Sequence, residues 1–209
     1  MTKDELAIRY PTLYHMAEAG SWPSIQRHGL LSTTALLDLF GISGSERYKI
    51  ESQWRPTRKT VYHPDYGKAA IRDQRPMPDS ELRKCLVGLT PQEWYEFLNR
   101  KTFFWVTTDR LIRMLNAWAY QNRAHWVITV DTRALLDRHA EQVTLSHFNT
   151  GFAYDNRKRG RDTFKIIKDY HTSWIAELAV EYSVPDIGEL TICVEEWKRN
   201  KRLRVIWKP

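Results

Sequence analysis

Apolar positions along the chain fall into short runs that suit strands better than long helices. The run "LYHM" at 13–16 is apolar and aromatic, and "TFFWVTTD" at 102–109 carries three consecutive aromatic side chains. Runs rich in β-branched and aromatic residues favour strands. The same pattern predicts further strands at 125–131, 143–146, 174–184, 190–197 and 202–207.

Helix signals alternate with these runs. Ser21 can cap a helix that has Pro23 in its first turn and ends at Gly29. The segment "TPQE" at 90–93 is typical of a helix start, where a threonine and a glutamate three residues later cap each other's backbone. The spacing of apolar residues predicts other helices at 33–40, 109–120 and 132–139.

The segment 41–78 has no clear period and is rich in Gly, Pro, Ser and charged residues, so we expect it to be irregular. Helices are expected mainly in the first two-thirds and strands gather late, an order typical of an α+β protein. With 209 residues, of which 42% are hydrophobic, the chain is long enough for one well-cored domain over 1–209.

Several classes of protein are disfavoured by what the sequence lacks. No apolar run approaches membrane-spanning length, and the charged start "MTKDE" lacks the apolar core of a secretory signal. Cys85 and Cys193 give neither a disulfide framework nor a zinc-ligand spacing. Phosphate loops, GxGxxG turns, GxSxG elbows and HExxH helices are absent. We therefore expect a cytoplasmic protein with no membrane contact and no metal.

The formal net charge of +7 is concentrated in two basic segments. One is "RKRGR" at 157–161, and the other begins at Lys198 and contains no acidic residue. Basic segments attract phosphate backbones by releasing counterions, although a solvated surface is the simpler alternative. The residues predicted to bind nucleic acid are Arg157, Lys158, Arg159, Lys198, Arg199, Lys201 and Arg202.

Three separated stretches together resemble the ADP-ribosyltransferase superfamily. They are "LYHMAEAGSWPSIQRHGL" at 13–30, "TFFWVTTDRLIRML" at 102–115 and "WIAELAVEYSVPDI" at 174–187. Within the superfamily the chain resembles DarT-type toxins and a bacterial family that shares the "NTG…DTF" and "AELAV…VPDI" phrases. The resemblance implies a split β-sheet with flanking helices, and NAD as the substrate that supplies ADP-ribose.

The resemblance also implies two catalytic residues. Glu177 matches the superfamily's strand-borne glutamate, whose carboxylate would stabilise positive charge on the ribose of NAD. Glu181 is its rival, because residues four apart on a strand point the same way. Arg72 is the nearest match to an arginine that assists catalysis and holds diphosphate, with Arg75 next.

The resemblance also implies which residues hold NAD. His15 would bind a ribose, although a lone histidine on an apolar strand is often part of the core. Gly29 would let the chain approach the ligand closely, or would simply end a helix. Phe104 or Trp105 would stack on nicotinamide, and Thr107 is either a hydrogen-bond donor or a helix cap.

The sequence therefore predicts an NAD-dependent ADP-ribosyltransferase that modifies nucleic acid, as a bacterial toxin or phage-defence effector with a possible antitoxin protein as its partner. Two alternatives stay open. The acceptor could be a protein side chain, or the domain could be a catalytically inactive nucleic-acid-binding module of the same fold.

Overall fold

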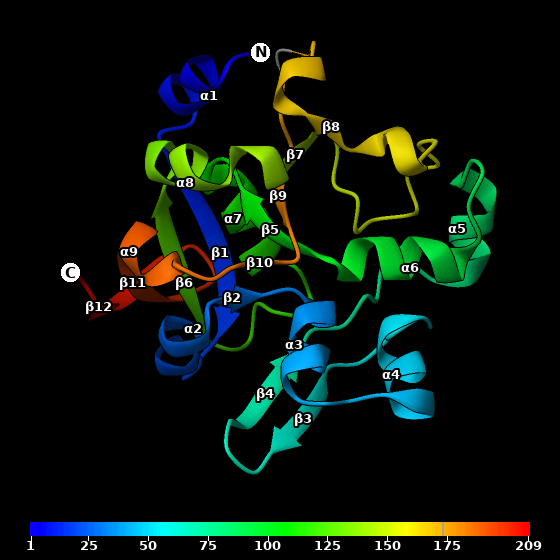
Figure 1. The fold of residues 1–209 in the computed structure, drawn as a ribbon, viewed down its shortest axis with the longest axis horizontal. Coiled ribbons are helices and arrows are strands. Elements are labelled where there is room, and N and C mark those ends of the chain that lie inside the picture. The colour runs from blue at the N-terminus through cyan, green and yellow to red at the C-terminus, as the bar shows by residue number, and fades with distance from the viewer. Residues whose placement is uncertain (173) are drawn as a thin grey trace.

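The computed structural model describes residues 1–172 and 174–209, and a large sheet organises them (Figure 1). The sheet has eight strands in the order β12-β11-β6-β1-β5-β9-β7-β8, and every strand pair in it is antiparallel. In that order the strands are β12 (Lys201–Trp207), β11 (Thr191–Lys198), β6 (His125–Asp131), β1 (Thr12–Glu18), β5 (Lys101–Trp105), β9 (Glu177–Glu181), β7 (Val143–Ser146) and β8 (Lys165–Ile166). The expected α+β class is confirmed.

Pairing between neighbouring strands is least extensive at the centre of the sheet. Strands β1 and β6 pair along their whole length, and β5 and β9 do the same. Between β1 and β5, however, only Tyr14 and Trp105 are paired. The two halves of the sheet thus meet at a single rung, and we call this place the central junction.

Helices cover both faces of the sheet, because the strands carry apolar side chains on both. The main core joins Leu13, Phe104 and Leu178 to helices α1 (Lys3–Arg9), α8 (Thr132–His139) and α9 (Ile187–Leu190). On the other face, Met16 and Trp105 pack with helix α7 (Thr108–Leu115). The remaining helices are α2 (Trp22–His28), α3 (Thr33–Leu39), α4 (Gly44–Glu51), α5 (Asp79–Cys85) and α6 (Pro91–Asn99).

Two of the expected caps are formed, whereas Ser21 precedes α2 but its hydroxyl donates to the Glu18 carbonyl instead of capping the helix. Thr90 and Glu93 form the predicted capping box of α6. The Thr107 hydroxyl accepts a hydrogen bond from the Arg110 amide, so this side chain caps α7. Of the two roles that the sequence left open for Thr107, the structure thus shows the cap.

Two expectations about regular structure were wrong. The segment 41–78 is not irregular throughout, because it contains α4 and a hairpin of β3 (Lys59–His63) and β4 (Gly67–Ile71), which lies at the foot of the molecule in Figure 1. These elements are short and polar, so their apolar period is weak. The helix expected at 109–120 ends at Leu115, and turns follow it.

Gly29 allows a close approach between two parts of the chain. Its φ is +86°, and a Cβ added to it would lie 2.7 Å from the Cα of Pro185. Beside it, β2 (Leu30–Leu31) pairs with β10 (Ser183–Val184). The glycine therefore serves the packing of this small sheet, and a contact with a ligand stays a prediction.

No helix among the described residues is long and apolar enough to cross a membrane.

Candidate functional site

Glu177 begins β9 and is buried, with 4% of its surface exposed. Its backbone lies between Trp105 of β5 and Ser146 of β7. One carboxylate oxygen, Oε2, accepts hydrogen bonds from the amide and the hydroxyl of Thr150, at 3.0 and 2.7 Å. A carboxylate in this position has left water and gained two neutral donors.

Burial raises the pKa of Glu177 to about 7. The hydrogen bonds from Thr150 and the positive charges of Arg110 and Arg159 act in the opposite direction, but they do not cancel the effect of burial. Carboxyl groups that titrate near neutral pH are typical of catalytic sites, although buried structural carboxyls can share the property.

Of the two arginines whose charges act on Glu177, Arg110 on α7 is more exposed than Arg159. It is half-buried, and its guanidinium carbon lies 4.5 Å from the centre of the Trp174 ring, which is exposed. The surroundings of Glu177 therefore combine a cation with an accessible aromatic surface.

Trp105, rather than Phe104, shares a face of the sheet with Glu177. Tyr14 pairs with Trp105 and Trp105 pairs with Glu177, and side chains of directly paired residues lie on the same face. Phe104 points the other way, and its ring is 1% exposed in the main core. The structure thus corrects the prediction that Phe104 could stack on a ligand, because the ring has no accessible face.

His15 lies at the central junction. Its Nδ1 is 2.9 Å from the carbonyl oxygen of Phe103, so Nδ1 carries the hydrogen and donates it, and Nε2 is left as an acceptor. Burial, together with the charge of Arg72, lowers the pKa of His15 to about 4. At neutral pH this imidazole is uncharged and has a defined tautomer.

Arg72 follows β4 and lies in a polar cluster with Glu18, Asp73, Tyr120 and Arg123. Its guanidinium carbon is 5.8 Å from the centre of the Tyr120 ring, and the Tyr120 hydroxyl donates to Asp73 at 3.0 Å. Arg72 Nη1, Arg123 Nε, Glu18 Oε2 and Asp73 Oδ2 are buried without a hydrogen-bond partner from the described residues. Such atoms need a water or a ligand as a partner.

This Arg72 cluster fits an anionic ligand only in part. Two arginines could donate to phosphate oxygens, but Glu18 and Asp73 stand beside them and offset their charge. Arg75, the second choice from the sequence, is exposed and lies over Trp118, with 5.0 Å from its guanidinium carbon to the ring centre.

The structure brings His15 and Arg72 together, but it does not join them to Glu177. His15 is one residue beyond Tyr14 on β1, so its side chain leaves the face that carries Trp105 and Glu177. Among the described residues, no hydrogen bond or ion pair links the His15–Arg72 group with Glu177. A ligand that contacts both groups has to extend across the central junction.

Glu181 is held in an ion pair. It accepts hydrogen bonds from Arg100 at 2.8 Å and from the largely buried Lys101 at 2.6 Å. Burial acts to raise the pKa of Glu181, but the bonds from Lys101 and Arg100 outweigh it, so this pKa lies below its ordinary value. The geometry favours Glu177 over Glu181 as the functional carboxyl.

The first basic segment is divided by burial. Arg157 and Lys158 are exposed, although Arg157 lies 3.5 Å from a carboxylate oxygen of Asp155 and Lys158 donates to the Lys84 carbonyl at 3.2 Å. Arg159 is 2% exposed, and its guanidinium donates to backbone carbonyls and to Asp155. The prediction that Arg159 binds nucleic acid was therefore wrong, because its donors point into the protein.

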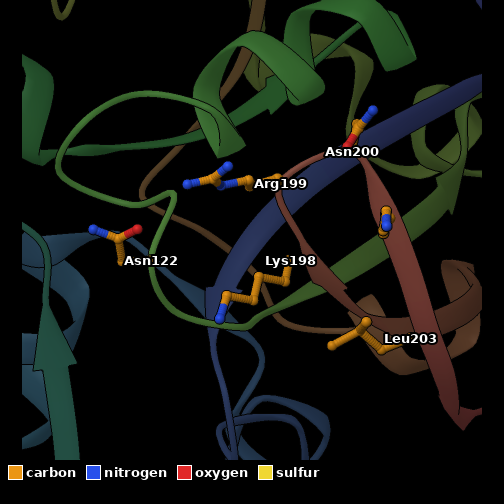
Figure 2. A pocket seen from close by; sticks show the side chains of 6 residues that line it. Asn122, Lys198, Arg199, Asn200 and Leu203 are labelled. Atoms are coloured by element: carbon orange, nitrogen blue, oxygen red, sulfur yellow. The ribbon is translucent and has the colours of Figure 1, made fainter.

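The second basic segment is the turn and outer strand of the β11–β12 hairpin. Lys198, Arg199 and Lys201 are exposed around the turn, and within the described part of the chain they form no ion pair. Figure 2 shows this turn beside Asn122, where a shallow hollow of about 400 Å³ opens. Arg202 differs from them, because it donates to Glu195 at 3.4 Å.

Thr150 and Arg110 are site residues that the sequence did not single out. Thr150 lies in the motif "NTG" and Arg110 in "TTDR", but neither motif indicates that its residue lies near Glu177. In the part of the chain that the structure describes, no group of three or more His, Cys, Asp or Glu side chains could hold a metal ion.

The chain belongs to the family of unknown function DUF7002, whose sequence pattern matches residues 11–193. The match includes His15, Arg72 and Glu177, and it ends before the basic turn of the β11–β12 hairpin. No curated protein matches the chain.

The buried state of Glu177 predicts how stability depends on pH. The folded protein holds the Glu177 proton up to about pH 7, whereas the unfolded chain releases it near the ordinary value of 4.5. This group's contribution to stability is therefore complete below its unfolded pKa and is lost as pH rises through about 7. We expect the free energy of unfolding of Glu177→Gln, relative to wild type, to rise by about 2 kcal/mol between pH 5 and 8.

Glu181→Gln is the matched control for this measurement by urea unfolding. Glu181 has the opposite pKa shift, so its replacement should destabilise the protein most at the higher pH, where Lys101 loses a charged partner. Equal pH dependence of Glu177→Gln and wild type would show that Glu177 titrates normally.

Proposed function

We propose that this protein is an NAD-dependent ADP-ribosyltransferase that modifies nucleic acid. The observation that carries the proposal is Glu177, a buried carboxyl with a pKa of about 7 that accepts two hydrogen bonds from Thr150. The charge of Arg110, which lies against the exposed ring of Trp174, acts on this carboxyl. The sequence resemblance selected the same residue on independent grounds.

NAD would supply ADP-ribose through cleavage of the bond between ribose C1 and the nicotinamide nitrogen. The electron pair of that bond leaves with nicotinamide, the sugar gains positive charge, and a nucleophilic atom of the acceptor forms the new bond to C1. Ionised Glu177 would accept a hydrogen bond from the ribose and stabilise the charge on the sugar. The two donors from Thr150 fix the direction of the carboxylate before substrate arrives.

His15 would bind another part of the same molecule. Its neutral ring offers Nε2 as an acceptor to a hydroxyl, and Arg72 supplies donors that have no partner among the described residues. To reach Glu177, a dinucleotide bound by this pair would have to extend across the central junction. The single residue pair between β1 and β5 is consistent with the split sheet that the superfamily resemblance implies.

Nucleic acid is the acceptor that the charge distribution favours. Lys198, Arg199 and Lys201 form a basic turn without acidic partners in the described residues, and the exposed Arg157 and Lys158 add a second basic site, in which Arg157 is paired with Asp155. Positive surface of this kind binds phosphate backbones without reading bases. A role as a toxin or phage-defence effector, with an antitoxin protein as partner, belongs to the same proposal.

Replacing Glu177 by Gln should lower turnover of NAD on the order of a hundredfold, because the charge that stabilises the transition state is lost while shape is kept. Turnover is measured as release of nicotinamide in the presence of separate pools of DNA, RNA and protein. Turnover by wild type should rise from pH 6 to 8 as Glu177 ionises.

NAD should still stabilise Glu177→Gln against heat, whereas His15→Ala should lose this stabilisation. Nicotinamide release that is equal in Glu177→Gln and wild type would exclude the proposed role of Glu177. Stabilisation by nucleic acid alone, with no turnover of NAD, would instead support an inactive binding module. Transfer to the protein pool alone would identify a protein acceptor.

Replacing Lys198, Arg199 and Lys201 by Gln should weaken nucleic-acid binding and flatten its dependence on salt. Each lost phosphate contact should reduce the slope of log K against log salt by about one unit. Arg202→Gln is the control, because Arg202 already donates to Glu195 and should leave the slope unchanged. An unaltered slope in the triple variant would assign the turn to ordinary solvated surface.

A further inference from the structure

Arg159 is a buried cation that donates hydrogen bonds to several backbone carbonyls of one loop. Its side chain is fully buried. Its nitrogens donate to three carbonyl oxygens and one carboxylate, namely Arg157 at 3.0 Å, Thr150 at 3.3 Å, Phe152 at 2.8 Å and Asp155 at 2.5 Å. A planar guanidinium with five N–H donors can satisfy so many acceptors at once, and an ammonium cannot.

The loop in question, residues 147–160, is the one that covers Glu177, and we call it the capping loop. One residue, Thr150, faces both partners. Its carbonyl oxygen accepts from Arg159, while its amide and hydroxyl donate to Glu177. The buried cation and the buried carboxyl therefore hold the same residue from two sides.

The capping loop is also fixed to the end of α5. The Arg159 amide donates to the carbonyl oxygen of Cys85 at 3.0 Å, and the Val87 amide donates back to the Arg159 carbonyl at 2.8 Å. Next to it, a Cβ on Gly160 would lie 2.6 Å from the carbonyl oxygen of Val87, so the two segments are in direct contact. Arg159 is thereby held in place by its own backbone.

We propose that Arg159 is a positioning residue, which holds the capping loop in the shape in which Thr150 donates two hydrogen bonds to Glu177. Its importance for catalysis rests on the proposed function of Glu177, but its structural effect does not. Arg159 contributes to the Glu177 site without contacting the carboxylate through a hydrogen bond of its own.

Other charges face Glu177 and have to be separated from this effect. Arg110 on α7 acts on the carboxyl through its charge, and so does Arg159 itself. Removing the Arg159 charge would raise the pKa of Glu177, while loosening the loop would admit water and lower it. The value of that pKa alone cannot report positioning, so the hydrogen bond has to be observed directly.

The Thr150 amide proton reports that bond. When an amide donates to a carboxylate, its NMR resonance moves as the carboxylate gains a proton. In wild type we expect the Thr150 amide shift to follow the titration of Glu177 near pH 7, and Glu177→Gln, which cannot titrate, should abolish this movement. Arg159→Met should reduce the movement by more than half, because methionine cannot donate to the loop carbonyls that the Arg159 guanidinium binds.

Arg161→Met is the matched control, since Arg161 lies in the same basic segment but is exposed. It should keep the full movement of the Thr150 resonance. Arg159→Lys keeps the charge without the planar donors, so it should resemble Arg159→Met if positioning is the cause. A Thr150 resonance that titrates in Arg159→Met as it does in Arg161→Met would overturn the proposal.

Turnover gives a second measurement and keeps the two proposals distinct. If Glu177 is catalytic, Arg159→Met should lower kcat for NAD about a hundredfold, the scale of a misplaced catalytic group, and change KM much less. Should Arg159→Met fail to fold, Thr150→Val tests the same link, because it removes the hydroxyl donor, and Thr150→Ser should restore it. An absence of NAD turnover in wild type would remove the proposed function and leave the NMR result to decide on Arg159.

Discussion

The buried carboxyl of Glu177 is the constraint on which the rest of the site depends. A carboxyl that is removed from water has to gain hydrogen-bond partners or keep its proton. Glu177 gains partners and also keeps its proton to a higher pH than usual. Thr150 supplies two donors, and the pKa nevertheless rises to about 7. The loop that carries Thr150 consequently has to be held firmly, and a second buried ion, Arg159, holds it.

Perturbed pKa values of this kind cluster at functional sites, and structural ion-pair networks also produce them. The junction between β1 and β5 also departs from regular structure. One rung joins the halves of the sheet, and next to it His15 donates to the Phe103 carbonyl instead of continuing regular pairing. Both features lie where an extended ligand would have to bind under the proposed function.

Much of the sheet could be predicted from the sequence, because strands such as 125–131 carry β-branched and aromatic residues on both faces. The hairpin at 59–71 could not, since its strands are polar and its one buried side chain in β3 gives no period. Glu177 was selected by its resemblance to a known motif. Thr150 donates to Glu177, and Arg159 donates to the Thr150 carbonyl, through contacts that no local pattern encodes. In the sequence, Arg159 does not differ from the exposed residues of its basic segment.

A carbon-13 NMR titration of the Glu177 side-chain carboxyl in the wild-type protein measures the protonation state of this site directly. The signal is assigned by its absence from Glu177→Gln. We expect a midpoint near pH 7, well above the ordinary value of 4.5, because the carboxyl is buried and the donors of Thr150 offset the cost of burial only in part. A midpoint at or below the ordinary value would show that Glu177 is a solvated or ion-paired surface glutamate, and it would contradict the description of this site.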